Sequence, residues 1–150
     1  MNRWQPLLVL FIVILIDQAT KYWALNSLIP YHSVPVMPML SWTLAYNTGA
    51  AFSFLSGAGD WHRWFFTGFS IAVCTLLFIW MWRSALKSKL QAASLAMIIG
   101  GAFSNVIDRF IHGHVIDFIL VYYKNYHWPV FNIADSAICV GAVMLFFTMK

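Results

Sequence analysis

The chain has 150 residues, of which 61% are hydrophobic and only 9% are charged, and its mean hydropathy is +0.73. Soluble domains carry about 25% charged residues, so this composition predicts an integral membrane protein with a single domain over residues 1–150. The formal charge of +4 comes from basic residues scattered through apolar surroundings. That pattern argues against a nucleic-acid-binding surface and favours a role in membrane orientation.

Four segments are long and apolar enough to form membrane-spanning helices, which need about 20 residues each. They are predicted at approximately 5–26, 63–82, 91–111 and 129–149. Pro6 and Pro129 stand at predicted helix starts, where proline is tolerated. The first segment also has features of a secretory signal, but no small-residue cleavage site follows closely, so we expect a retained helix.

The connection between the second and third predicted helices, RSALKSK (83–89), has three basic residues and no acid. The positive-inside rule therefore predicts that it is cytoplasmic. With four spans, both termini are cytoplasmic too, and the connections 27–62 and 112–128 face the other side. A multi-pass protein of this topology has its polar clusters toward the outer side of the membrane.

The first outer connection is too long to be a simple link. Its stretch SVPVMPM is rich in proline and extended, and LSWTLAYN alternates large residues as a strand does. We expect a small β-structured platform on the outer surface. In the second outer connection, Gly113 predicts the end of the third helix, and VIDFILVYY predicts an extended or interfacial segment.

Unusual polar residues all fall toward the outer ends of the predicted helices or in the outer connection. They are Asp17 and Lys21, then Asn47 in the stretch YNTGAAFSF, then Asn105, Asp108 and Arg109, and finally Asn132 and Asp135. Spacings of three or four place the members of each helical group on one face. Structural interpretations stay open, namely an ion pair that eases insertion and a polar clasp between helices.

The pairing of two aspartates predicts the chemistry of the outer end. Asp117 lies nine residues after Asp108, about 180° around a continuous helix, so the two can face one site only if the helix ends between them. Two close carboxylates titrate as a unit, and the ionised one can take a proton from water. Asp117 and Asp135 suit this aspartic-protease arrangement, and Asp108 competes with Asp117 for one position.

Five motifs in order carry a resemblance to a known family. They are IDQATKYWA (16–24), YNTGAAF (46–52), GGAFSNVIDR (100–109), GHVIDFI (113–119) and FNIADSAI (131–138). With these motifs the chain resembles the lipoprotein signal peptidases, also called signal peptidase II, over its whole length. The resemblance implies an all-α membrane protein with four transmembrane helices, a small extracytoplasmic β-cradle and a short periplasmic interfacial segment.

The resemblance also implies an activity and a role for each matched residue. The enzyme would be an aspartic endopeptidase that removes the signal peptide of prolipoproteins just before a diacylglyceryl-modified cysteine. The catalytic pair would be Asp117 and Asp135. Support for this pair would come from Asn105, Asp108, Arg109 and Asn132. Asp17 and Lys21 would be structural, and the residues in contact with substrate would be Asn47 and Gly49. No metal or cofactor is implied, and the partners would be prolipoproteins and membrane lipids around a monomer. Ser104 is a departure, because a glycine often precedes the asparagine of this motif.

Three other functions stay open. A transporter or proton-conducting bundle would also use intramembrane acids, but it needs polar residues at both ends, and the inner halves LLVLFIVILI and ICVGAVMLFF are apolar. An assembly subunit would use its acids to join helices and would tolerate Asp to Asn changes at 117 and 135. A metalloenzyme would be built on His112, His114 and a carboxylate, and chelators would inhibit it.

Overall fold

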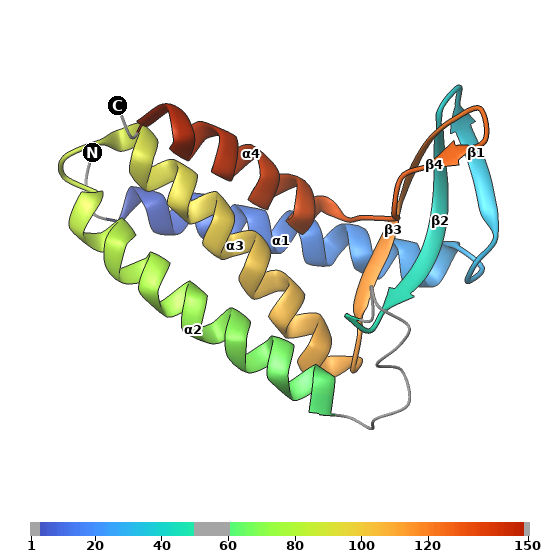
Figure 1. Cartoon of the computed structure of the whole chain (residues 1–150), viewed down its shortest axis with the longest axis horizontal. Helices are drawn as coiled ribbons and strands as arrows, with labels where there is room; N and C mark the ends of the chain where they lie inside the picture. Colours follow the sequence, from blue (N-terminus) through green and yellow to red (C-terminus); the bar gives the residue numbers. More distant parts are fainter. Residues whose placement is uncertain (1–3, 50–60, 149–150) are drawn as a thin grey trace.

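The computed structural model describes residues 4–49 and 61–148 as four helices with a four-stranded antiparallel sheet at one end (Figure 1). The helices are α1 (Gln5–Ser27), α2 (Trp61–Ser84), α3 (Lys89–Ile111) and α4 (Ile133–Thr148). The strands are β1 (Ser33–Met37), β2 (Leu40–Asn47), β3 (Val115–Tyr123) and β4 (Tyr126–His127), and they pair in the order β1-β2-β3-β4. The part of the first outer connection that spans residues 50–60, including Asp60, lies outside the described residues.

Three of these helices, α1, α2 and α3, are long and apolar enough to cross a membrane. They confirm the predicted helices to within two residues at each end. The fourth helix, α4, is apolar but has only 16 residues, fewer than the roughly 20 that a full span requires. The fold is therefore mostly helical, with a small sheet, and the prediction of four complete spans is not confirmed.

The central helix is α3, and α1, α2 and α4 all pack against it. The contact between α3 and α4 is close because each helix presents a glycine to the other. A methyl group added at Gly101 would overlap the carbonyl oxygen of Ala134, and one added at Gly141 would overlap that of Ser94. This packing fixes the start of α4 against the polar residues of α3.

The bundle has two chemically different ends (Figure 1). The connection from α2 to α3 lies beside the first turn of α1 and the last turn of α4, and the sheet lies at the opposite end. The segments predicted as outer connections therefore gather at one end of the molecule. The predicted platform is confirmed there, and β2 covers the eight residues LSWTLAYN that were expected to form a strand.

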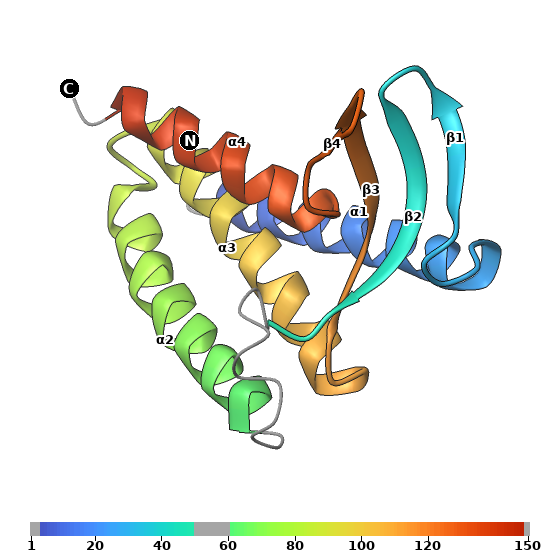
Figure 2. The same ribbon diagram turned by 45° about the vertical axis from the view of Figure 1, so that its right-hand side comes forward.

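The sheet packs on the last turns of α1, which run past the strands (Figure 2). Ala24 of α1, Leu44 of β2, and Ile116 and Phe118 of β3 form a buried apolar cluster there. Trp23 adds edge contacts to the ring of Phe118 at 6.2 Å between centroids. The sheet is thus attached to α1 by apolar packing, which holds β3 near the bundle.

The start of the fourth helix was predicted wrongly. It begins at Ile133 rather than near 129, because the preceding segment pairs with β3 instead of coiling. Phe131 and Ile119 exchange two backbone hydrogen bonds, of 3.0 and 2.9 Å. Pro129 therefore belongs to an extended segment and not to a first helical turn. As a result Asn132, expected inside the helix, lies immediately before it.

Candidate active site

A buried lysine joins α1 to α3 at the sheet end of the bundle. The ammonium of Lys21 lies 2.7 Å from Asp17 Oδ2, 2.7 Å from Asp108 Oδ2 and 2.8 Å from Asn105 Oδ1. An ammonium has three N–H donors, so each one has its own acceptor. Buried charges are tolerated when they are paired and hydrogen-bonded in this way. The predicted common face of Asp17 and Lys21 is confirmed.

The two carboxylates around Lys21 also bind the backbone of the neighbouring elements. Asp17 Oδ1 accepts a 2.7 Å hydrogen bond from the amide of Ala134 in the first turn of α4. Asp108 Oδ2 accepts one of 3.1 Å from the amide of Ile116 in β3. The lysine cluster therefore positions both the helix that carries Asp135 and the strand that carries Asp117.

Two members of this cluster were not predicted as site residues. Gln18 donates from Nε2 to Asp108 Oδ1 at 2.8 Å and to Ser104 Oγ at 3.0 Å, and Ser104 Oγ donates to Asp17 Oδ2 at 2.7 Å. The signal for Gln18 was its position as a polar residue next to Asp17 in an apolar helix. Ser104 was noticed as a departure from the family pattern, and the structure shows that its hydroxyl binds a buried carboxylate.

Asn132 and Asp135 cap the start of α4 reciprocally. The amide of Asp135 donates to Asn132 Oδ1 at 2.9 Å, and the amide of Asn132 donates to Asp135 Oδ2 at 3.3 Å. The pair satisfies donors that the first turn of a helix cannot pair internally, as a capping box does. A carboxylate in this position also interacts favourably with the helix dipole. These contacts explain how the apolar helix accommodates an acid in its first turn.

The same asparagine connects the helix to the strand. Asn132 Nδ2 donates to Asp117 Oδ1 at 2.7 Å and to Asn105 Oδ1 at 3.2 Å. Asn105 in turn donates from Nδ2 to Asp135 Oδ1 at 2.9 Å. Asp117 and Asp135, from two different elements, are thereby held by one hydrogen-bonded pair of asparagines.

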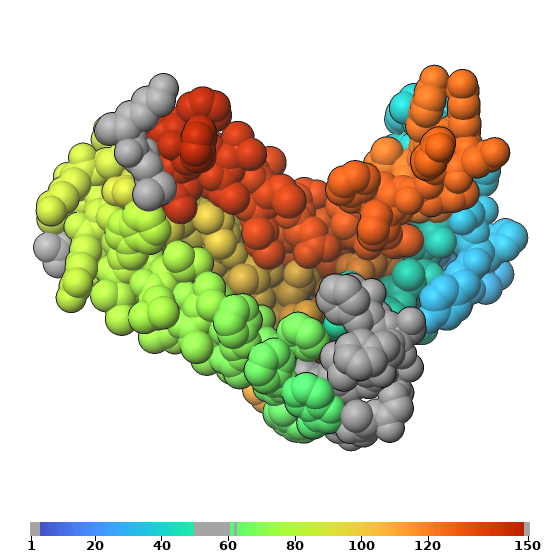
Figure 3. All heavy atoms as spheres, in the orientation of Figure 1, coloured from blue at the N-terminus to red at the C-terminus, as the bar shows by residue number. Residues whose placement is uncertain are grey.

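Asp117 is almost fully buried in β3 and still borders a cavity. The cavity has a volume of about 310 Å³ and lies between the end of β2 and the segment that contains Pro129 and Val130. Asn47 Nδ2 donates to Asp117 Oδ2 at 3.1 Å from the cavity rim. Burial and the nearby charge of Asp135 raise the pKa of Asp117 to about 7. In space-filling form, the surface is hollowed between α4 and the tip of the sheet (Figure 3).

Asp108 and Asp117 occupy different environments, although the sequence leaves both as candidates for the same catalytic position. The helix ends at Ile111, and Gly113 has a φ of +82°, which turns the chain back as predicted. Both oxygens of Asp108 accept hydrogen bonds inside the protein, and its side chain is 1% exposed. Asp117, and not Asp108, lines the cavity.

Arg109 and Gly49 contact the site less directly. The guanidinium of Arg109 is half-buried, and its one hydrogen bond of 3.4 Å, to the carbonyl of Asn105, is long. It makes no ion pair among the described residues, and its charge acts on the three nearby aspartates from a longer distance. Gly49 has a φ of +84° and donates its amide to Asn47 Oδ1 at 2.9 Å, which fixes the side chain that binds Asp117.

Arg63 was missed as well. It donates from Nε to the carbonyl of Arg109 at 2.6 Å and from Nη2 to that of Phe110 at 2.7 Å. These bonds satisfy the last carbonyls of α3 and hold the turn into β3. A cation in the first turn of α2, where the helix dipole disfavours it, was the signal that it has a partner elsewhere.

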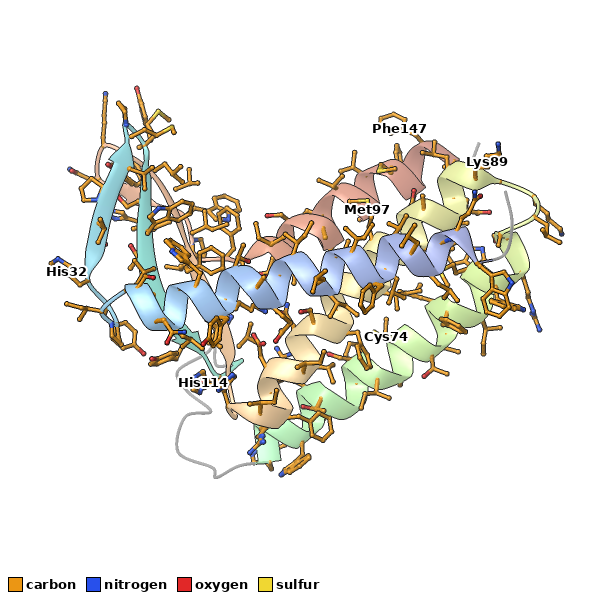
Figure 4. The ribbon with its side chains drawn as sticks, turned by 180° about the vertical axis from the view of Figure 1, so that it is seen from behind. His32, Cys74, Lys89, Met97, His114 and Phe147 are labelled. Carbon is orange, nitrogen blue, oxygen red and sulfur yellow. The ribbon has the colours of Figure 1, made fainter. Side chains whose placement is uncertain are left out.

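His112 caps the end of α3, and His114 follows it at the turn into β3, where Figure 4 labels it. Their ring centroids are 6.1 Å apart, and the ring of His114 packs against Tyr46 at 4.4 Å. Burial and the neighbouring His112 lower the pKa of His114. Within the described ranges, no three His, Cys, Asp or Glu side chains form a group that could hold a metal ion.

Comparisons with known proteins agree with the motifs. Residues 9–150 match the family model described as signal peptidase (SPase) II. The chain is 48% identical over 138 residues to the lipoprotein signal peptidase of Pseudoalteromonas atlantica, covering 92% of this chain and 84% of that protein. It is 50% identical over 136 residues to that of Pseudomonas putida, covering 89% and 80%. A bacterial membrane enzyme solved by the in meso method at 1.9 Å resolution superposes with a TM-score of 0.82 at 30% identity, covering 96% of this chain and 91% of that one.

Proposed function

Because this chain belongs to the signal peptidase II family and is an aspartic peptidase, we propose that it cleaves diacylglyceryl-modified prolipoproteins immediately before the lipidated cysteine. Asp117 and Asp135 are proposed as the catalytic pair. The observation that carries this assignment is that both carboxylates bind Asn132, and that Asp117 lines a cavity. Substrate entering that cavity meets Asp117 directly.

The raised pKa of Asp117 suggests which of the two acids is protonated and which is ionised. At neutral pH Asp117 holds a proton and donates a hydrogen bond to the scissile carbonyl oxygen. Asp135 is ionised and takes a proton from a water molecule, whose oxygen adds to the carbonyl carbon. As the water adds, the carbonyl oxygen takes the proton of Asp117 and becomes a hydroxyl. When the tetrahedral intermediate collapses, Asp135 gives its proton to the leaving amine of the cysteine, and that hydroxyl returns its proton to Asp117. The cycle uses the side chains of the chain and one water molecule.

The remaining site residues have supporting roles in this proposal. The cluster of Asp17, Lys21 and Asp108 holds α1, α3 and β3 in register, and Arg109 balances part of the negative charge. Asn47 orients Asp117 from the end of β2, and the turn at Gly49 presents this edge of the sheet to substrate. These residues place the reacting groups; they do not react themselves.

We further propose that α4 is the fourth crossing of the inner membrane, with both termini cytoplasmic and the sheet in the periplasm. At 1.5 Å per residue, the 16 residues of α4 extend about 24 Å, less than a hydrocarbon core of about 30 Å. Asp135 in its first turn would then lie below the outer surface of the bilayer. A bond between a membrane-spanning signal peptide and a lipid-anchored cysteine lies at the same depth. The chain acts as a monomer.

The test is a cleavage assay with the purified full-length chain in detergent and a diacylglyceryl-modified prolipoprotein, followed by the gel shift on loss of the signal peptide. Asp117→Asn and Asp135→Asn are each expected to lower the rate by at least about 10³-fold while remaining folded. EDTA is expected to have no effect, whereas a metalloenzyme would be inhibited.

Asp108→Asn is the comparison variant, since it removes a charge from the same cluster without touching the cavity. Loss of cleavage in Asp108→Asn together with full activity in Asp117→Asn would show that Asp108, and not Asp117, is the catalytic partner of Asp135. Full activity in both the 117 and 135 variants would refute the mechanism and favour the assembly-subunit interpretation. A folded wild type that cleaves nothing would favour the transporter.

A further inference from the structure

A groove runs between α1 and α2 at the end of the bundle away from the sheet. It contains two cavities, of about 370 and 330 Å³, and Phe78 lines both. The two helices pack on α3 and barely touch one another, so Ile99 and Phe103 of α3 form the floor. Figure 4 shows Cys74 of α2 in the space between α1 and α2. The groove is therefore a continuous feature with two walls and a floor.

The groove is about as deep as one leaflet of a bilayer. Its lining residues extend from 4 to 14 on α1 and from 71 to 83 on α2. At 1.5 Å per residue these stretches are about 15 and 18 Å long, and half of a hydrocarbon core of about 30 Å is about 15 Å. The lining is almost entirely apolar, so a single acyl chain lying along it would match it in both length and chemistry.

The open end of the groove is positively charged. Arg83 lines the cavity of about 370 Å³ and is exposed, and Lys87 and Lys89 follow within six residues. None of the three makes an ion pair within the part of the chain that the structure describes. The four aspartates of that part lie at the sheet end. Among the described residues, no carboxylate therefore balances the charge at this end.

Aromatic side chains frame the same opening. Trp4 and Trp82 meet edge to face at 5.7 Å between centroids, and Phe78 stacks on Trp82 at 6.2 Å. Tryptophan is enriched where membrane helices meet the headgroup layer. The aromatic frame therefore marks the level at which a lipid headgroup would lie, next to the guanidinium of Arg83.

We propose that this groove binds one anionic phospholipid, with an acyl chain between α1 and α2 and its phosphate on Arg83. Basic pockets between membrane helices are known to select anionic headgroups, because each cation near the surface adds to the attraction. A zwitterionic lipid carries its own cation and gains less. The groove lies at the opposite end from Asp117 and Asp135, so the inference does not depend on the proposed peptidase mechanism.

The test is native mass spectrometry of the purified full-length chain in detergent, titrated with phosphatidylglycerol or phosphatidylcholine of the same acyl chains. Wild type is expected to retain one phosphatidylglycerol with at least about fivefold preference over phosphatidylcholine, as one basic residue near the surface would supply. Arg83→Gln should abolish that preference. Thr75→Trp, which fills the groove from an exposed position on its wall, should reduce retention of both lipids.

Two matched variants control for charge and bulk. Lys124→Gln removes a cation at the sheet end, and Leu76→Trp introduces the same indole on α2 at an exposed residue outside the groove. Both should retain lipid as wild type does, and circular dichroism checks that every variant is folded. Equal retention of the two lipids by wild type would overturn the proposal. So would unchanged retention in both groove variants, or a dimer peak that disappears in Thr75→Trp, which would assign the groove to a second copy of the chain.

Discussion

Asn132 donates a hydrogen bond of 2.7 Å from its side-chain amide to a carboxylate oxygen of Asp117. Its side-chain oxygen accepts a hydrogen bond from the amide of Asp135 in the first turn of α4. One side chain therefore performs two functions that can be separated, because helix capping needs only an oxygen and binding Asp117 needs the N–H group.

Replacing Asn132 by serine or alanine separates these functions. Serine caps helices about as well as asparagine, so Asn132→Ser should lose only the hydrogen bonds of the amide N–H group, about 1.5–3 kcal/mol of the free energy of unfolding. Asn132→Ala also loses the cap and should be less stable than Asn132→Ser by about 1 kcal/mol. Both variants lack the donor to Asp117 and should lose most cleavage activity. Thermal unfolding in detergent and the gel-shift assay measure the two effects, and a fully active Asn132→Ser would contradict the role given to the amide.

The buried ammonium of Lys21 should be one of the most sensitive positions in the chain. Lys21→Met leaves Asp17 and Asp108 buried without their cation, and breaking a buried pair in this way costs about 3–5 kcal/mol. The effect should appear as a large decrease in the unfolding temperature. Lys124→Met, at an exposed turn of the sheet, is the matched control and should change stability by less than about 0.5 kcal/mol. Comparable stability of the two variants would show that the Lys21 cluster is dispensable.

The pKa of Asp117 predicts a dependence of stability on pH. The ordinary value is 3.8 and the folded value is about 7. Between these values the folded protein holds a proton that the unfolded chain has released, so wild type loses stability as pH rises from about 4 to about 7, and little more above that. Asp117→Asn cannot titrate, so its stability relative to wild type should increase from pH 5 to about pH 7, by at most about 3 kcal/mol, and then stay level to about pH 8.5.

Unfolding temperatures of wild type and Asp117→Asn, measured across that pH range, test the sign. The difference should change in favour of the variant from pH 5 to about pH 7 and should then level off. A difference that stays constant with pH, or that grows in favour of wild type, would mean that Asp117 ionises freely in the folded protein.

Ser104 should stabilise this particular chain through Asp17. Ser104→Ala removes a hydrogen bond to a buried carboxylate, a class of bond worth about 1.5–3 kcal/mol. Ser94→Ala is the matched control on the same helix, because that buried hydroxyl binds only the carbonyl of Leu90 one turn earlier. The control should cost about 0.5 kcal/mol or less. Equal unfolding temperatures for the two variants would show that the Ser104 hydroxyl does not stabilise Asp17.

Local patterns predicted the helices and β2, whereas pairing across the chain was not predictable from them. The apolar runs and the alternation of LSWTLAYN are properties of single segments, and they gave bounds that the structure confirms closely. The start of α4 was missed because Phe131 pairs with Ile119, twelve residues earlier in the chain. Proline at position 129 is as compatible with that extended segment as with a helix start.

The sequence predicted which residues belong to the site better than it predicted the hydrogen bonds and ion pairs that they make. Spacing placed Asp17 and Lys21 on one face, but spacing within α1 cannot show that Asp108 of α3 binds the same ammonium. Hydrogen-bonding partners on another helix depend on how the helices pack. For that reason Gln18 and Arg63, whose partners are 46 or more residues away, were not recognised from the sequence.

The seam between the sheet and the bundle is built in two ways, and this has a mechanical consequence. Toward α1 the sheet is held by apolar packing, whereas toward α3 and α4 it is held by hydrogen bonds, from Asn132 to Asp117 and from the amide of Ile116 to Asp108. The groups that make these hydrogen bonds are buried, so each donor depends on its one acceptor and water cannot replace it. A hydrogen bond is sensitive to distance and angle, whereas apolar contacts tolerate small shifts. The polar edge of the seam therefore sets the position of Asp117 more precisely than the apolar edge does.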